Sequence, residues 1–275
     1  MVNIIFKSRV AQWEQNAPQP KKPIKVLLVK DHFVANNDLL FTIFFRASFK
    51  MMCIEGRVAL ASFTVFAILA LYQVRILYGD YYSFVYCVAT LGSAFACVLV
   101  LPYNGIVKRS AFLGTIFGGS FALLFVAGSP WTTFFVYTTF LAFFHFSEYL
   151  MTAMYNSDRL SLDSFLLNHS FEYKAAAVAS WVEFGVEAYF FPSLKSFGFL
   201  SFIGLAMVIC GEVSRKLAMI TAKSNFSHIV QSHKKDGHIL VTAGIYSISR
   251  HPAYMGWFVW SIGMLSLLFS LPFSL

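Results

Sequence analysis

The chain has 275 residues, of which 58% are hydrophobic and 12% are charged. Soluble domains carry about 25% charged residues, so this composition excludes an ordinary soluble enzyme and predicts an all-α polytopic membrane protein in the lipid bilayer. The net charge of +8 is that expected for basic cytoplasmic loops, and we predict no nucleic-acid partner.

The first segment, residues 1–57, is predicted to be a basic cytoplasmic N-terminus. Its stretch 39–54 is apolar, but it is too short to cross a bilayer and is interrupted by Arg46 and Lys50. An interfacial helix is the structure that fits such a stretch.

The remaining residues, 58–275, are predicted to form a transmembrane domain of about seven helices, because seven apolar stretches approach the roughly 20 residues that a span requires. A long polar loop, residues 214–253, precedes the last stretch. The predicted spans are residues 58–78, 81–102, 110–128, 131–151, 172–191, 197–213 and 254–275.

Basic residues set the orientation. If the 214–253 loop is cytoplasmic and the spans alternate, only Arg75, Lys174 and Lys195 of the 21 basic residues fall outside cytoplasmic segments. The positive-inside rule therefore places both the N-terminus and this loop in the cytoplasm.

Ionisable residues within the predicted spans are costly in a bilayer and are often functional. Interhelical hydrogen bonding by protonated carboxyls is the interpretation that we favour, and a substrate role is the alternative. No metal site is predicted, because too few ligand-type residues cluster. The residues are His145, Glu148, Glu183, Glu187 and Glu212.

Two glycines in one predicted span, Gly114 and Gly118, form a GxxxG step. Such a step permits close helix packing, either within the fold or between subunits.

The polar stretch 231–260, QSHKKDGHILVTAGIYSISRHPAYMGWFVW, leads directly back into an apolar segment. It contains a short β-favouring run, 238–241, and then a glycine turn at Gly244. Pro252 favours a first helical turn and disfavours helix for His251 before it, so a helix should begin at one of these two residues. The positive N-terminus of that helix would face the polar loop and suit a carboxylate.

Two stretches resemble the isoprenylcysteine carboxyl methyltransferase family. The first is SEYL at 147–150 with SLDSFLLNHS at 161–170 and EY at 172–173; the second is NFSHIVQ at 225–231 through RHPAYMGW at 250–257. The GxYxxxRHPxYxG pattern alone is also similar to sterol reductases and phospholipid methyltransferases. The 161–170 stretch selects the carboxyl methyltransferases.

The resemblance implies a multi-pass enzyme of the endoplasmic reticulum membrane. It would transfer a methyl group from S-adenosylmethionine to the C-terminal carboxylate of a prenylated cysteine, as in Ras-like GTPases and other CaaX proteins. A homodimer is left open. By position, the residues implied to bind the cofactor are Gln231, His238, Ile239, Leu240, Val241, Tyr246, His251, Pro252, Ala253 and Tyr254.

The sequence departs from the family pattern at its end. Family members continue into one more span and a tail, and their substrate-binding Arg and Glu would lie beyond Leu275, so no catalytic residue is assigned. Arg250 is expected to be the only basic side chain close to the pocket. We therefore keep two alternatives: a catalytically inactive homologue that binds cofactor or pairs with the full-length enzyme, and a sterol-type reductase.

Overall fold

The computed structural model describes residues 49–77, 105–128, 131–167, 171–195, 197–228 and 239–268. Regular structure within these ranges is helical and includes no strand, which confirms the predicted all-α fold for this part of the chain. All of these residues belong to one compact unit, Arg46–Leu275. The predicted span 81–102 and nearly all of the 39–54 stretch lie outside the described ranges.

Six α-helices of the described ranges coincide with six of the predicted spans. Most of their ends lie within a few residues of the predicted ends, but the helix that follows residue 198 continues nine residues beyond its predicted end at 213. The helices are α3 Ile54–Leu77, α5 Gly105–Leu123, α6 Trp131–Tyr155, α7 Phe171–Phe190, α8 Phe199–Ala222 and α9 Pro252–Leu268.

One helix among the described residues, over Ile54–Val74, has both the length and the hydropathy to cross a membrane, and Pro252–Leu268 is a shorter apolar helix. Large apolar side chains are nevertheless exposed on several helices, including Val182 on α7 and Phe258 on α9. Seven spans therefore remain a prediction.

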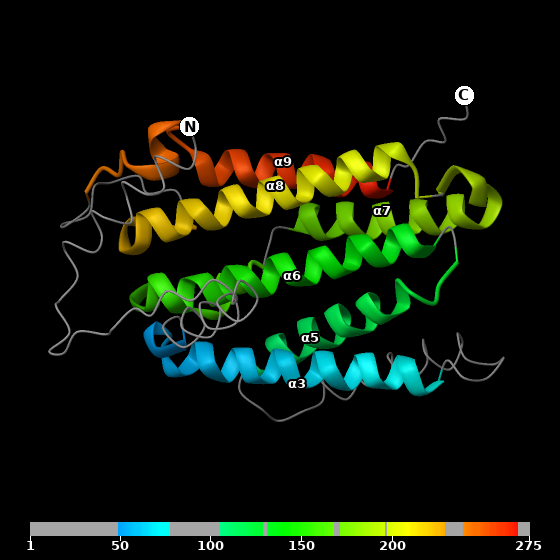
Figure 1. Ribbon diagram of the computed structural model, residues 1–275, viewed down its shortest axis with the longest axis horizontal. Helices are drawn as coiled ribbons and strands as arrows, with labels where there is room; N and C mark the ends of the chain where they lie inside the picture. The colour runs from blue at the N-terminus through cyan, green and yellow to red at the C-terminus, as the bar shows by residue number, and fades with distance from the viewer. Residues whose placement is uncertain are drawn as a thin grey trace, which may run out of the picture. The chain divides into compact units, whose positions relative to one another are not determined.

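Helix α6 is central to the described fold (Figure 1). Its Phe146 stacks on Phe63 of α3 with ring centroids 3.8 Å apart, and its Phe144 stacks on Trp260 of α9 at 4.2 Å. Its Tyr149 stacks at 3.9 Å on Phe165 of the segment that follows α6. Burial of such rings supplies most of the packing energy of a core.

Glycines allow two helix pairs to approach closely. The GxxxG step of α5 lies against α3, where a Cβ on Gly114 or Gly118 would overlap backbone atoms of Phe63 or Ala67. The predicted close packing therefore occurs within the fold. In the antiparallel pair of α8 and α9, a Cβ on Gly211 would lie 2.5 Å from the Gly256 carbonyl oxygen.

The starts of α3 and α9 and the ends of α6 and α8 lie at the same end of the helices, which we call the loop end (Figure 1). The Cys53 amide at the start of α3 donates to the Ala153 carbonyl near the end of α6, at 3.4 Å. At the opposite end, Lys195 contacts Glu187 of α7 and the Leu268 carbonyl of α9. These contacts join α3 to α6 at the loop end and α7 to α9 at the opposite end.

The glycine contact between α3 and α5 gives a stability prediction. Gly118→Ala should lower the free energy of unfolding by about 1–3 kcal/mol, because the added methyl group forces the two helices apart. Thermal unfolding in detergent micelles would measure the loss. The matched control is Gly185→Ala on α7, where a Cβ meets nothing within 4 Å. Equal melting temperatures for the two variants would contradict the prediction.

Candidate active site

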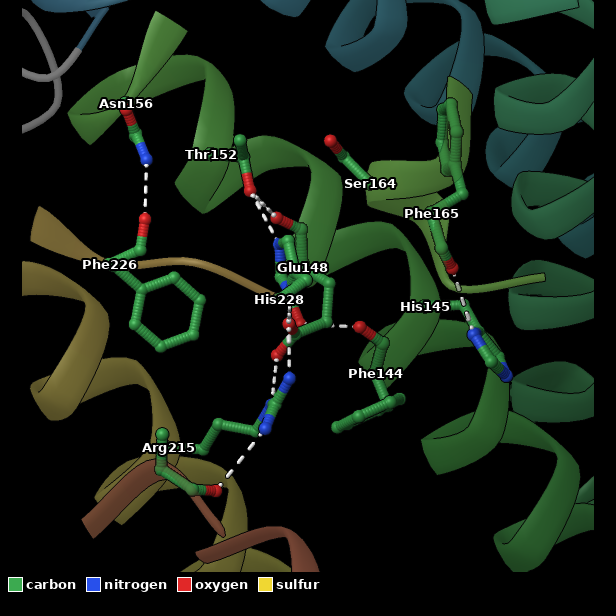
Figure 2. A network of polar contacts seen from close by, with 12 residues as sticks. Phe144, His145, Glu148, Thr152, Asn156, Ser164, Phe165, Arg215, Phe226 and His228 are labelled. Atoms are coloured by element: carbon green, nitrogen blue, oxygen red, sulfur yellow. Dashed lines mark hydrogen bonds and ion pairs between the residues drawn. The ribbon is translucent and has the colours of Figure 1, made fainter. Parts of the chain in front are cut away.

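A buried ion pair joins α6 to α8 near the loop end. Glu148 of α6 is completely buried, and Arg215 of α8 is 7% exposed. The Arg215 guanidinium donates from Nε to Glu148 Oε1 at 2.7 Å and from Nη2 to Oε2 at 2.9 Å. Figure 2 shows this two-pronged contact. Because the carboxylate and guanidinium planes match, this is the strongest form of such a contact.

A second cation and a second carboxylate extend the pair. Lys216 contacts Glu148 and also lies 3.2 Å from Glu212, which is one helical turn earlier on α8. Ser147 of α6 donates its hydroxyl to Glu212 at 2.7 Å. The predicted contacts between helices are therefore present, but Glu148 lies in a charged pair. We expected the Glu148 carboxyl to be protonated, and this was wrong: Arg215 and Lys216 balance the negative charge of an ionised carboxylate.

His228, in the loop that follows α8, completes the group that we call the polar network: Ser147, Glu148, Thr152, Glu212, Arg215, Lys216 and His228. Thr152 donates to the Glu148 backbone carbonyl, so its oxygen accepts from His228 Nε2 at 3.1 Å. Burial lowers the pKa of His228 to about 4; the nearby Glu148 raises it, and the two cations lower it further. The imidazole is therefore neutral at pH 7, although its Nδ1 lies 3.5 Å from Glu148.

The polar network also reaches the start of α9. Arg215 Nη1 donates to the Ala253 backbone carbonyl at 3.2 Å, and Gly256 packs so closely that its Cβ would lie 2.8 Å from the Arg215 amide nitrogen. Helix α9 begins at Pro252, as the sequence predicts. A single arginine therefore connects α6, α8 and the first turn of α9.

Two predicted cofactor residues, Gln231 and His238, lie outside the described residues. The described part of the run that follows them, residues 239–241, does not form a strand. Ile239 and Leu240 are exposed, and the Ile239 amide donates to the Asn225 side chain at 3.0 Å. The β-favouring composition of this run was misleading, because the described residues include no neighbouring strand that could pair with it.

Val241 and Tyr246 pack inward at the loop end. With Ile245 they pack against a buried cluster that includes Ala218 and Met219 of α8 and Ala253 of α9. Gly244 begins the short turn Gly244–Ser247 at φ +60, a conformation that favours glycine. Burial raises the pKa of Tyr246, and the nearby Arg215 opposes the rise.

The first residues of α9 divide between buried and exposed positions. Pro252 and Ala253 are buried, while His251 and Tyr254 are exposed, with ring centroids 6.2 Å apart. The structure therefore brings Val241, Tyr246 and Ala253 into one cluster and places two exposed rings beside it. A cofactor role for these residues stays a prediction.

Sequence reasoning missed Arg215 and Lys216, and the expectation that Arg250 would be the only basic side chain near the pocket was wrong. Arg215 and Lys216 were predicted to lie in the polar loop 214–253, whereas α8 continues through Ala222 and includes them. A usable signal was present: Glu212 and Lys216 are four residues apart, a spacing that favours a pair on one helix face.

The buried ion pair predicts a large loss of stability when it is broken. Glu148→Gln should cost about 3–5 kcal/mol, because the buried Arg215 loses its charged partner while the side chain at position 148 keeps its size. Unfolding in detergent micelles measures the cost. Glu183→Gln serves as the control, because Glu183 is exposed on α7; a similar loss in that variant would contradict the assignment.

The depressed pKa of His228 predicts a pH dependence of stability. Between about pH 6.5 and about pH 4 the unfolded chain binds a proton that the folded chain does not. Stability should therefore fall across this window as the pH is lowered, by at most ~3 kcal/mol. Melting curves of the native chain and of His228→Gln over this range test the effect. Parallel curves for the two would contradict it.

The comparisons with known proteins agree with one another. The model of the isoprenylcysteine carboxyl methyltransferase (ICMT) family matches residues 203–273. The protein-S-isoprenylcysteine O-methyltransferase of Xenopus laevis is 47% identical over 76% of this chain and 76% of its own length. That of Rattus norvegicus is 55% identical over 59% of this chain, which spans 57% of the rat protein.

A solved structure is also similar: that of the eukaryotic intramembrane Ras methyltransferase ICMT (isoprenylcysteine carboxyl methyltransferase) without a monobody. It superposes with a TM-score of 0.73 at 40% sequence identity and covers 80% of this chain and 81% of that chain. These similarities favour the methyltransferase prediction over the sterol-type reductase. The chain belongs to the isoprenylcysteine carboxyl methyltransferase family.

Proposed function

We propose that this chain transfers a methyl group from S-adenosylmethionine to the C-terminal carboxylate of a prenylated cysteine in Ras-like GTPases and other CaaX proteins. Its family membership supports the reaction. The structural observation that carries the proposal is the contact between the polar network and the first turn of α9, where Arg215 donates to the Ala253 carbonyl.

The loop end has features that suit the cofactor. Ile239 and Leu240 offer exposed apolar side chains that could cover an adenine ring, and the first turn of α9 offers free backbone amides to a carboxylate. His251 and Tyr254 place exposed rings at the same helix start. When bound, S-adenosylmethionine supplies an activated methyl group; the chain's residues bind it and orient it.

The substrate carboxylate requires a cation and no general base. A C-terminal carboxyl has a reference pKa of about 3.3–3.7, so it is already ionised at pH 7. Arg215 contacts the α9 start, Lys216 is its neighbour on α8, and Glu148 holds both of these cations in place. We infer that the polar network orients the carboxylate oxygen and keeps it away from water.

An apolar cavity suits the prenyl chain. It has a volume of about 270 Å³ and lies between α5, α6 and α7. Leu166, in the left-handed backbone region at φ 53, lines it; such unusual conformations persist where a site requires them. Its lining residues are Phe112, Leu113, Ile116, Tyr137, Leu141, Ala142, His145, Leu166, Leu167, Ala177, Val178 and Trp181.

The cavity and the polar network share one stripe of α6. Tyr137, Leu141, His145, Glu148 and Thr152 are three or four residues apart, which places them along one helix face. A substrate with a charged head and an apolar tail matches this order. The tail would enter from the bilayer beside Val178, which lines the cavity and is exposed on α7. We place the enzyme in the endoplasmic reticulum membrane with the loop end in the cytoplasm.

Methyl transfer from labelled S-adenosylmethionine to N-acetyl-S-farnesylcysteine, in membranes that contain only this chain, tests the proposal. His251→Ala should lower the rate by about tenfold or more, because it removes an exposed ring from the cofactor site. Ile248→Ala is the control; this side chain is 84% exposed in the same loop, and its rate should not change.

The inactive-homologue alternative has its own signature in the same assay. No transfer by the native chain, together with retained binding of the labelled cofactor, would contradict the proposed activity and leave a cofactor-binding homologue. Equal losses in His251→Ala and Ile248→Ala would contradict the assigned cofactor site.

A further inference from the structure

The cavity has a near end and a far end relative to the polar network. Along α6 its lining residues run from His145, three residues before Glu148, back to Tyr137. The separation of eight residue steps between Tyr137 and His145 corresponds to about 12 Å of helix. At the near end, His145 Nδ1 lies 2.9 Å from the Phe165 carbonyl oxygen, so the buried segment after α6 closes against the helix there (Figure 2).

Two hydrogen-bonded aromatic side chains form the far end. Trp181 Nε1 of α7 donates to Tyr137 Oη of α6 at 3.3 Å. Tyr137 is 8% exposed, whereas Trp181 is 40% exposed. The bond satisfies a polar atom of each ring in apolar surroundings, so neither ring turns away without losing it.

More aromatic rings fill the space beyond this pair. Phe134 stacks on Tyr137 with centroids 6.3 Å apart and on Phe184 of α7 at 5.2 Å, and Trp131 meets Phe184 at 6.0 Å. Phe184 is almost completely buried. A tail that reaches Tyr137 and Trp181 therefore meets a packed aromatic layer.

We propose that the Tyr137–Trp181 pair limits the length of the prenyl chain that the cavity accepts and so sets the preference between farnesyl and geranylgeranyl substrates. The proposal rests on the proposed function. The geranylgeranyl chain is one isoprene unit longer than the farnesyl chain. The last isoprene unit of the geranylgeranyl chain must either displace Trp181 or remain outside the cavity. In both cases the longer chain fits less well than the farnesyl chain, which ends at the Tyr137–Trp181 pair.

Trp181 is the residue to change, because it is the more exposed member of the pair and its removal lengthens the cavity. In membranes with the full chain, kcat/KM is measured for N-acetyl-S-farnesylcysteine and N-acetyl-S-geranylgeranylcysteine. Trp181→Ala should raise the geranylgeranyl-to-farnesyl ratio by about tenfold, the effect of added room in an apolar pocket. Tyr137→Phe keeps the ring and breaks the bond, and should raise the ratio by a smaller factor.

Phe190→Ala is the matched control. It removes an aromatic ring from the same helix at a position that is 64% exposed and does not line the cavity, so the ratio should not change. A ratio unchanged in Trp181→Ala, or changed equally in Phe190→Ala, would overturn the proposal.

A second readout separates failure of the length limit from failure of the proposed function. Should the native chain transfer no methyl group to either compound, the proposed activity fails. Equilibrium binding of the two radiolabelled prenylcysteines to the detergent-solubilised native chain and to Trp181→Ala then decides the length limit. A shift of relative affinity toward the geranylgeranyl compound supports it, and an unchanged relative affinity overturns it.

Discussion

The bond between Glu148 and Arg215 is the interaction on which the described structure depends. Charges of this kind are costly to bury and are tolerated only with matched partners. Here one guanidinium contributes two bonds to α6 and a third to the first turn of α9. The position of the α9 start, and of the exposed rings that it carries, therefore follows from a contact made in the interior and not from the loop itself.

That contact in turn requires two helices to come unusually close. Gly211 of α8 and Gly256 of α9 face each other so that backbone touches backbone, and only then does Arg215, one turn after Gly211, reach the Ala253 carbonyl. A side chain at either glycine would separate the helices and leave one guanidinium N–H unpaired. The bond from Arg215 to α9 therefore depends on the two glycines that let α8 and α9 approach.

The sequence predicted the parts of this arrangement that are local. Apolar length located the helices, and Pro252 fixed the start of α9, because both signals act within a few residues. The partner of Glu148 could not be predicted, because Arg215 is 67 residues away and only the packing of α6 on α8 brings the two together. For the same reason the isolated run at Ile239–Val241 looked like a strand, although no partner strand exists among the described residues.

The stripe on α6 explains why a buried charge and an apolar cavity occur on neighbouring turns. His145 lines the cavity, and Glu148 lies in the network one turn later. A carboxylate held near Arg215 would have its tail directed along the same helix toward Tyr137. Had the network faced a different side of α6, head and tail would need separate entrances. Their alignment on one face favours a substrate in which a charged terminus and a long hydrocarbon are joined by a short link, as in a prenylated cysteine.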